Sequence, residues 1–86
     1  ADATVRQGDA LLALDRPGDA LLRWREAVEV ARAFHCWEPL TEALERQHAL
    51  LLRARDTARA REVAADLDAA RDPARRESWA DARSAA

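Results

Sequence analysis

Three side chains of this sequence could bind a soft metal ion or act as a nucleophile: His35, Cys36 and His48. A zinc site needs three or four ligands at regular spacing, and the adjacent pair His35 and Cys36 lacks the spacing with which one helix chelates an ion. A catalytic thiol needs an activating base and a pocket, and no motif near Cys36 indicates either. We therefore expect no metal, no cofactor and no catalytic residue. His48 is expected to be a hydrogen-bonded core histidine, and Cys36 a half-buried thiol in a turn.

The carboxylates alternate with arginines instead of facing each other across an apolar pocket. Glu42 and Arg46, for example, stand four residues apart in the order that favours an ion pair on a helix. The two glycines of the chain do not form a phosphate-binding loop. These patterns are typical of solvated helix surfaces and indicate a protein that is not an enzyme.

The segment 46–61, from Arg46 to Arg61, is the most basic part of the sequence, with five arginines and a single acid, Asp56. Such a segment could contact the phosphates of nucleic acid. However, the whole chain has a net charge of -2, and the segment contains no aromatic residue. A recognition helix also needs base-reading residues in a known motif. Direct nucleic-acid binding is therefore the weaker alternative to a basic turn that faces solvent or an acidic neighbour.

The composition favours helices over strands. Ala occurs 22 times, Arg 14 times and Leu 11 times, whereas Ile, Lys, Asn, Met and Tyr are absent. This bias is typical of GC-rich coding sequences such as those of actinobacteria. Ala, Leu, Arg and Glu are strong helix formers, and Val is the only β-branched apolar residue type present.

Length and segment composition set further limits. The single cysteine excludes an internal disulfide, and no apolar run approaches the roughly 18 residues of a membrane span. The sequence also begins without the pattern of a signal peptide. We therefore expect residues 1–86 to form one all-α domain without a membrane partner, in the cytoplasm.

Turn signals and apolar periodicity predict five helices, at residues 3–14, 19–34, 39–54, 57–71 and 73–83. Pro17, Pro39 and Pro73 each open a stretch of helical periodicity, since proline is tolerated in the first turn of a helix. Asp56 and Asp72 are candidate N-caps. Because the links between the segments are short, we expect neighbouring helices to be antiparallel.

Apolar stripes indicate the faces on which three of these helices pack. The stripe of 57–71 consists mostly of methyl groups, so this helix must lie tight against a neighbour. Gly8 within the first helix costs about 1 kcal/mol relative to Ala, which predicts a close helix crossing there. The stripes contain Leu21, Trp24, Val28 and Ala31, then Leu40, Leu44, Leu51 and Ala54 around His48, and finally Ala60, Ala64 and Leu67.

The first two expected helices resemble the next two at a spacing of 40 residues, because Leu11 coincides with Leu51 and Ala20 with Ala60. The pattern predicts two copies of a helical hairpin, at about 3–34 and 38–71, and a capping helix at about 73–83. One unit has Thr4, Gly8, Leu11, Ala20, Trp24 and Ala27 where the other has Leu44, His48, Leu51, Ala60, Ala64 and Leu67.

This pattern resembles the tetratricopeptide repeat (TPR) family. That family places a small residue in the first helix, a large apolar residue three later, and then an Ala, an aromatic residue and a second Ala in the next helix. The matching residues are Gly8, Leu11, Ala20, Trp24 and Ala27. Thr4 and Arg32 depart from the pattern in the first unit, and His48 and Ala64 in the second. The longer spacing is similar to that of repeats in large bacterial transcriptional regulators.

The resemblance implies antiparallel helical hairpins stacked as a short TPR-like solenoid, with a C-terminal capping helix anchored by Trp79. Trp24 would fill the space between the helices of one hairpin, and Ala20 and Ala27 would admit the close approach at Gly8. In the family, a ligand peptide lies along the groove of the first helices. Carried over by position, this groove presents Val5, Asp9, Leu12, Glu42, Glu45, Ala49, Leu52 and Arg53.

These groove residues include more acidic than basic side chains, which suggests a protein or peptide partner that is basic or amphipathic. The alternative is that they face water or another subunit. Stable arrays usually need at least three repeats, so two units suggest an excised part of a longer array or self-association. We therefore expect a non-catalytic protein-interaction module related to bacterial regulatory or scaffold proteins. The second hypothesis is a stand-alone helical protein that homodimerises through its solenoid end.

Overall fold

The computed structural model describes the backbone of residues 2–85 and the side chains of residues 5–81. It contains α1 (Asp2–Ala13), α2 (Pro17–Ala33), α3 (Trp37–Arg53), α4 (Thr57–Arg71) and α5 (Arg76–Ala85). Within residues 2–85 there is no strand, so the expected all-α class is confirmed. None of the described helices has the length and apolar character that crossing a membrane requires.

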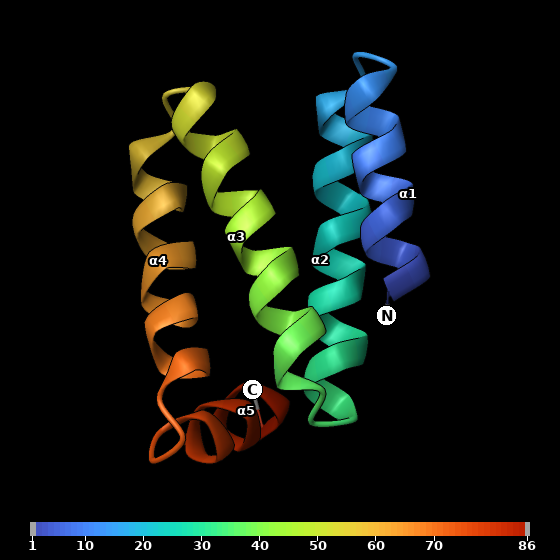
Figure 1. Cartoon of the computed structure of the whole chain (residues 1–86). Helices are drawn as coiled ribbons and strands as arrows, with labels where there is room; N and C mark the ends of the chain where they lie inside the picture. Colours follow the sequence, from blue (N-terminus) through green and yellow to red (C-terminus); the bar gives the residue numbers. More distant parts are fainter. Residues whose placement is uncertain (1, 86) are drawn as a thin grey trace.

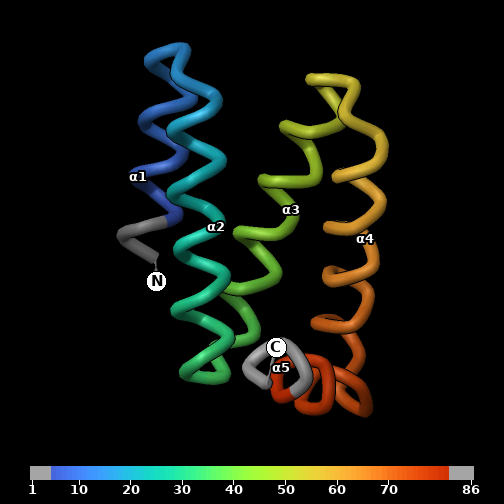
Figure 2. Tube along the Cα trace, turned by 180° about the vertical axis from the view of Figure 1, so that it is seen from behind, coloured from blue at the N-terminus to red at the C-terminus, as the bar shows by residue number. Residues whose placement is uncertain are grey.

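Helices α1 to α4 stand side by side with antiparallel neighbours, and α5 lies across one end of them (Figure 1). Each of α1 to α3 packs against the next helix in sequence, and α1 also contacts α3. Helices α2 and α4 therefore flank α3, and α5 contacts both of them (Figure 2). The fold thus has an α1–α3 side and an α2–α4 side.

The expected helices are present, with boundaries that differ by one to three residues at most ends. Pro17 is the first residue of α2, and Pro39 lies in the first turn of α3. Asp56 caps α4 as predicted, because its carboxylate accepts a hydrogen bond from the backbone N–H of Arg59 at 3.2 Å. These helices therefore begin where the sequence has proline in the first turn or aspartate at the N-cap, the positions at which these residues are favoured.

The prediction that Pro73 opens the last helix is wrong, since α5 begins at Arg76. Asp72 does not cap that helix. Its carboxylate accepts the N–H of Ala74 at 3.0 Å, and its carbonyl accepts the N–H of Arg76 at 2.9 Å. Asp72 therefore forms a separate turn that contains Pro73 and redirects the chain across the end of the other helices.

Three successive turns share one hydrogen-bond pattern. The N–H groups of Arg16, Cys36 and Asp56 donate to the carbonyls of residues 11, 31 and 51, at 2.9, 2.8 and 2.9 Å. The residue just before each donor has a positive φ, of 58°, 55° and 61° at positions 15, 35 and 55. This is the Schellman arrangement, which satisfies the last carbonyls of a helix. The 40-residue spacing in the sequence therefore corresponds to two helix–turn units of 20 residues, as the acceptors at 11, 31 and 51 show.

The left-handed residues of these turns are Asp15, His35 and Arg55, although glycine adopts this conformation with the least steric cost. The Arg55 side chain is exposed and has no ion pair or hydrogen bond within residues 5–81. We expect Arg55→Gly to raise the free energy of unfolding by about 0.5–1 kcal/mol, measured by urea denaturation. Ala54→Gly, at a neighbouring residue with a φ of -79°, should lower it. If Arg55→Gly lowered the free energy of unfolding and Ala54→Gly raised it, the left-handed conformation of residue 55 would be contradicted.

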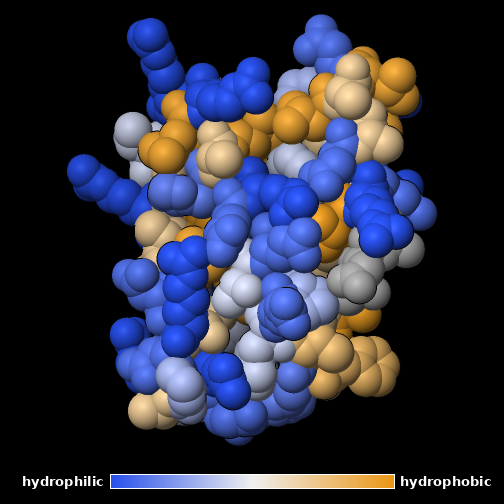
Figure 3. All heavy atoms as spheres, viewed as in Figure 1, coloured by the Kyte–Doolittle hydropathy of each residue, from blue (hydrophilic) through white to orange (hydrophobic). Residues whose placement is uncertain are grey.

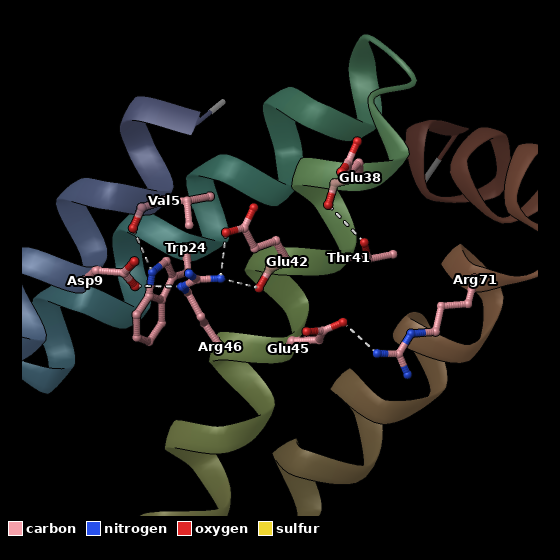
Figure 4. Close-up of polar contacts among 9 residues, drawn as sticks. All are labelled: Val5, Asp9, Trp24, Glu38, Thr41, Glu42, Glu45, Arg46 and Arg71. Carbon is pink, nitrogen blue, oxygen red and sulfur yellow. Dashed lines mark hydrogen bonds and ion pairs between the residues drawn. The ribbon is translucent and has the colours of Figure 1, made fainter.

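The core surrounds Trp24, whose side chain is 1% exposed. Its indole Nε1 donates a hydrogen bond to the carbonyl of Val5 in α1 at 3.2 Å (Figure 4). Gly8 lies against the same indole, because a Cβ atom on Gly8 would stand 2.3 Å from the Nε1 atom. The predicted close crossing at Gly8 and the burial of Trp24, Ala20 and Ala27 are confirmed.

The predicted apolar stripes enter the core with three differences. Ala54 is exposed because α3 ends before it. His48 is half-buried without a hydrogen bond within residues 5–81, so the expectation of a bonded core histidine is wrong. Gln47 is the buried polar residue of α3 instead. Leu11, Leu21 and Ala64 are half-buried, whereas Val28, Ala31, Leu40, Leu44, Leu51, Ala60 and Leu67 are buried.

Helix α5 is held by side chains from both α2 and α4. The indole of Trp79 donates a hydrogen bond to the Asp66 carboxylate of α4 at 3.0 Å, and Arg32 of α2 donates to the carbonyl of Ala80 at 3.3 Å. Trp79 packs against the core, and Ala80 is buried. As a result, α5 closes one end of the space between α2 and α4.

Candidate functional site

Most of the residues predicted to line a partner groove lie on the side formed by α1 and α3, which we call the α1–α3 face. Val5 is an exception, because its side chain is buried in the core. Asp9, Leu12 and Glu42 are half-buried on this face, and Ala49, Leu52 and Arg53 of α3 are exposed.

Glu45 is a second exception. Its carboxylate is exposed and pairs with Arg71 of α4 at 2.6 Å, so this side chain points away from α1 (Figure 4).

Arg46 lies at the centre of an ion-pair cluster on the α1–α3 face. Its Nε atom lies 2.7 Å from the Asp9 carboxylate of α1, and its Nη1 atom lies 3.1 Å from the Glu42 carboxylate (Figure 4). The hydrogen bond to Asp9 raises the pKa of Arg46, although partial burial opposes this change. The expected Glu42–Arg46 pair is confirmed, and Asp9, which is 37 residues away in sequence, joins it.

A pocket of about 400 Å³ opens beside this cluster, between the N-terminal halves of α1 and α3. Three acidic residues and two arginines line this pocket. Two of the three acidic residues are the ones whose carboxylates pair with Arg46. Its polar lining consists of Arg6, Asp9, Glu38, Glu42 and Arg46. The excess of acidic groups favours the binding of a positively charged group.

The other end of the α1–α3 face is apolar. Leu52 is 51% exposed, Ala49 is exposed one turn before it, and Leu12 of α1 is half-buried. Figure 3 shows apolar residues gathered near the α1–α2 and α3–α4 turns, at the top of that view, whereas the middle and lower parts are mainly hydrophilic. The face therefore combines an acidic pocket with an apolar end.

The arginines of segment 46–61 do not all face the same way. Arg46 points to α1, where it meets Asp9 (Figure 4). The Arg59 side chain is exposed and lies 3.5 Å from the Asp56 carboxylate at the start of α4. Arg53, Arg55 and Arg61 are exposed as well. The basic run is thus divided between an interhelical contact, a helix cap and the solvent-facing surface.

The candidate metal ligands and nucleophile do not converge. His35 Nδ1 lies 2.9 Å from the Glu77 carboxylate of α5, and the His35 ring meets Trp37 edge-on at a centroid distance of 5.3 Å. Cys36 is exposed instead of half-buried, and its thiol lies 3.7 Å from the carbonyl of Phe34. Within residues 5–81, no three His, Cys, Asp or Glu side chains are arranged to hold a metal ion.

A second surface, which the sequence patterns did not indicate, runs along α3 between α2 and α4. Two adjoining cavities of about 560 and 210 Å³ share Arg25, Gln47 and Asp66, so we treat them as one depression and call it the α2–α4 trough. Asp66 accepts the hydrogen bond from Trp79, which places α5 at one end of the trough. Its apolar lining includes Leu21, Leu22, Val28, Leu44, Leu51 and Val63.

No protein-family model, curated protein or solved structure matches the chain. The α1–α3 face offers separate acidic and apolar regions. The α2–α4 trough is mixed in character, because charged residues line it together with the apolar ones and the buried Gln47: Arg25, Glu26, Glu29, Arg59, Glu62 and Asp66.

Proposed function

We propose that this chain is a non-catalytic protein-interaction module that binds a basic, amphipathic segment of a partner protein along the α1–α3 face. The observation that carries this proposal is the division of the face into an acidic pocket and an apolar end. A basic side chain of the partner enters the pocket beside Glu38, and apolar side chains cover Leu52 and Leu12. Exposed apolar area and complementary charge are the features that give such contacts affinity and orientation.

The length of the face limits the bound segment. Residues 38–52 of α3 rise by about 21 Å, at about 1.5 Å per residue. An extended peptide covers this distance with roughly six or seven residues. The partner segment is therefore short, with a basic residue near one end and apolar residues near the other.

We also propose that the five helices form a short TPR-like solenoid with α5 as its cap. The recurrence of the Schellman turn at 11–16, 31–36 and 51–56 supports this arrangement, as does the contact of α1 with α3. In such a solenoid the first helices of the two hairpins, α1 and α3, line the groove that holds a peptide. A stack with a continuous core and a polar outer cap is also how such repeats gain stability.

Selection from a random peptide library on the immobilised chain tests the proposed function. We expect the enriched peptides to combine a basic residue with apolar residues several positions away. Binding of one selected synthetic peptide, measured by fluorescence anisotropy, should weaken by about tenfold or more in Glu38→Lys and in Leu52→Asp.

Leu22→Asp is the matched control, because Leu22 is as exposed as Leu52 but lies on α2, away from this face. It should leave the peptide affinity unchanged. Peptides that bind equally well to Glu38→Lys and Leu52→Asp, or a selection that enriches no peptide, would remove the α1–α3 face from the proposal.

A further inference from the structure

The acidic pocket of the α1–α3 face carries an unbalanced negative charge. Its lining contains three carboxylates and two guanidinium groups. Arg46 pairs with two of the carboxylates, those of Asp9 and Glu42. The third, Glu38, stands four residues before Glu42 on α3 and has no ion pair within residues 5–81. Like charges at this spacing repel each other, so a monovalent cation bound beside Glu38 would balance the pocket.

The three carboxylates line one pocket without converging on one point. Asp9, Glu38 and Glu42 all border the pocket, yet within residues 5–81 no three acidic, His or Cys side chains are arranged to hold a metal ion. A compact cation, such as a metal ion or the ammonium group of lysine, therefore cannot contact all three at once. A guanidinium group is planar and carries five N–H donors that point in different directions. Its shape suits carboxylates that are spread around a pocket.

Arg46 shows how a guanidinium group fits this pocket. Its Nε atom lies 2.7 Å from Oδ1 of Asp9 on α1, and its Nη1 atom lies 3.1 Å from Oε1 of Glu42 on α3 (Figure 4). One guanidinium group thus bridges two carboxylates from different helices. Each carboxylate has a second oxygen that can accept a further donor. Arg46 therefore holds two of the three acidic groups in place for a ligand.

We infer that the pocket selects the guanidinium group of an arginine side chain over the ammonium group of a lysine, and that Arg46 is the positioning residue that sets this preference. The inference rests on the proposed function, because it specifies the basic residue of the partner segment as arginine. The guanidinium group of the partner contacts Glu38 and the second oxygens of Asp9 and Glu42. Its charge is delocalised over the planar group, which lessens the repulsion from Arg46.

Two capped amino acids, N-acetyl-argininamide and N-acetyl-lysinamide, test this preference directly. Each probe is titrated into the isotope-labelled chain, and the NMR shifts of the backbone amides of residues 6–9 and 38–46 give its dissociation constant. The arginine probe should bind about fivefold more tightly or better. Both probes carry the same net charge, so the difference reports the shape of the cation. Equal affinities, or shifts confined to other residues, would overturn the inference.

Arg46→Gln tests the positioning role, and Arg6→Gln is its matched control. Arg6 lines the same pocket, but its side chain is exposed and has no ion pair within residues 5–81. Both changes remove one positive charge, so both should strengthen binding of the lysine probe. Only Arg46→Gln should reduce the preference for arginine to below about twofold, because the bridge between the two carboxylates is lost. A preference that survives Arg46→Gln would contradict the role of Arg46.

The NMR spectra also show whether each variant is folded. If Arg46→Gln does not fold, Arg46→Lys replaces it, since this variant keeps the charge and loses the planar fork, and it should lower the preference as well. The inference and the proposed function can fail separately. Selected peptides that contain lysine as often as arginine would overturn the inference and leave the proposed function standing. If the library yields no peptide, the proposed function fails, and the two capped amino acids still decide which cation the pocket prefers.

Discussion

Replacing Trp24 with alanine should lower the free energy of unfolding by about 3–5 kcal/mol. The indole of this α2 residue is 1% exposed, belongs to the core and lies against Gly8 of α1. Its loss leaves a cavity that the surrounding side chains fill only in part. The carbonyl of Val5 also loses the hydrogen bond from Nε1. Urea denaturation followed by far-UV circular dichroism measures the change without relying on tryptophan fluorescence.

Two control variants separate the contributions of Trp24. Trp24→Phe keeps an aromatic ring but removes the N–H, so it should cost less than Trp24→Ala. Trp37→Ala removes an indole that is only half-buried, so its effect should also be smaller. A Trp24→Ala protein with the same unfolding midpoint as the parent would show that this indole does not fill the core.

Gly8→Ala should destabilise the protein by roughly 1–2 kcal/mol, although alanine is the better helix former by about 1 kcal/mol. The new Cβ atom would stand 2.3 Å from Nε1 and 2.6 Å from Cδ1 of Trp24. The buried indole has little room to move, so the overpacking strain exceeds the gain in helix propensity. Thermal and urea denaturation both report the change.

Gly18→Ala is the matched control for this substitution. Gly18 lies in the first turn of α2, and a Cβ atom there would have no neighbour within 4 Å. The same chemical change should therefore stabilise the protein, by up to about 1 kcal/mol. A stabilised Gly8→Ala protein would contradict the close crossing.

A double-mutant cycle links Gly8 to Trp24. In a Trp24→Phe background the Nε1 atom is absent, so Gly8→Ala should lower the free energy of unfolding by less than it does in the parent protein. Residues in direct contact show coupling free energies of about 0.5–3 kcal/mol. Additive effects would indicate that the strain at Gly8 has another source.

The local sequence determined the helices and several of their ends. Helix formers over most of the chain predicted α1 to α5, because helical hydrogen bonds connect residues only four apart. Proline and aspartate signals placed the starts of α2 and α4. The same reasoning failed at Pro73, since the carboxylate of Asp72 stabilises a turn in which proline precedes the helix.

The close crossing at Gly8 was also predicted from the sequence, because a glycine inside a helix has a recognisable cost. That the indole of Trp24 is the group that lies against Gly8 was shown only by the structure. Pairing of Arg46 with Glu42 followed from helical spacing. By contrast, Asp9 lies 37 residues from Arg46 and meets it only because α1 packs beside α3. No periodicity indicates such a contact.

Only the tertiary structure decided how far the packed surface of α2 extends around the helix. The predicted stripe residues Trp24, Val28 and Ala31 are buried, as are Ala20 and Ala27, whereas Leu22 and Val30 are exposed. The physical reason is distance: α2 lies close to both α1 and α3, and small residues permit that approach. The sequence therefore determined that these helices form and where most of them begin. The packing of α2 between its neighbours decided which of its sides stays exposed.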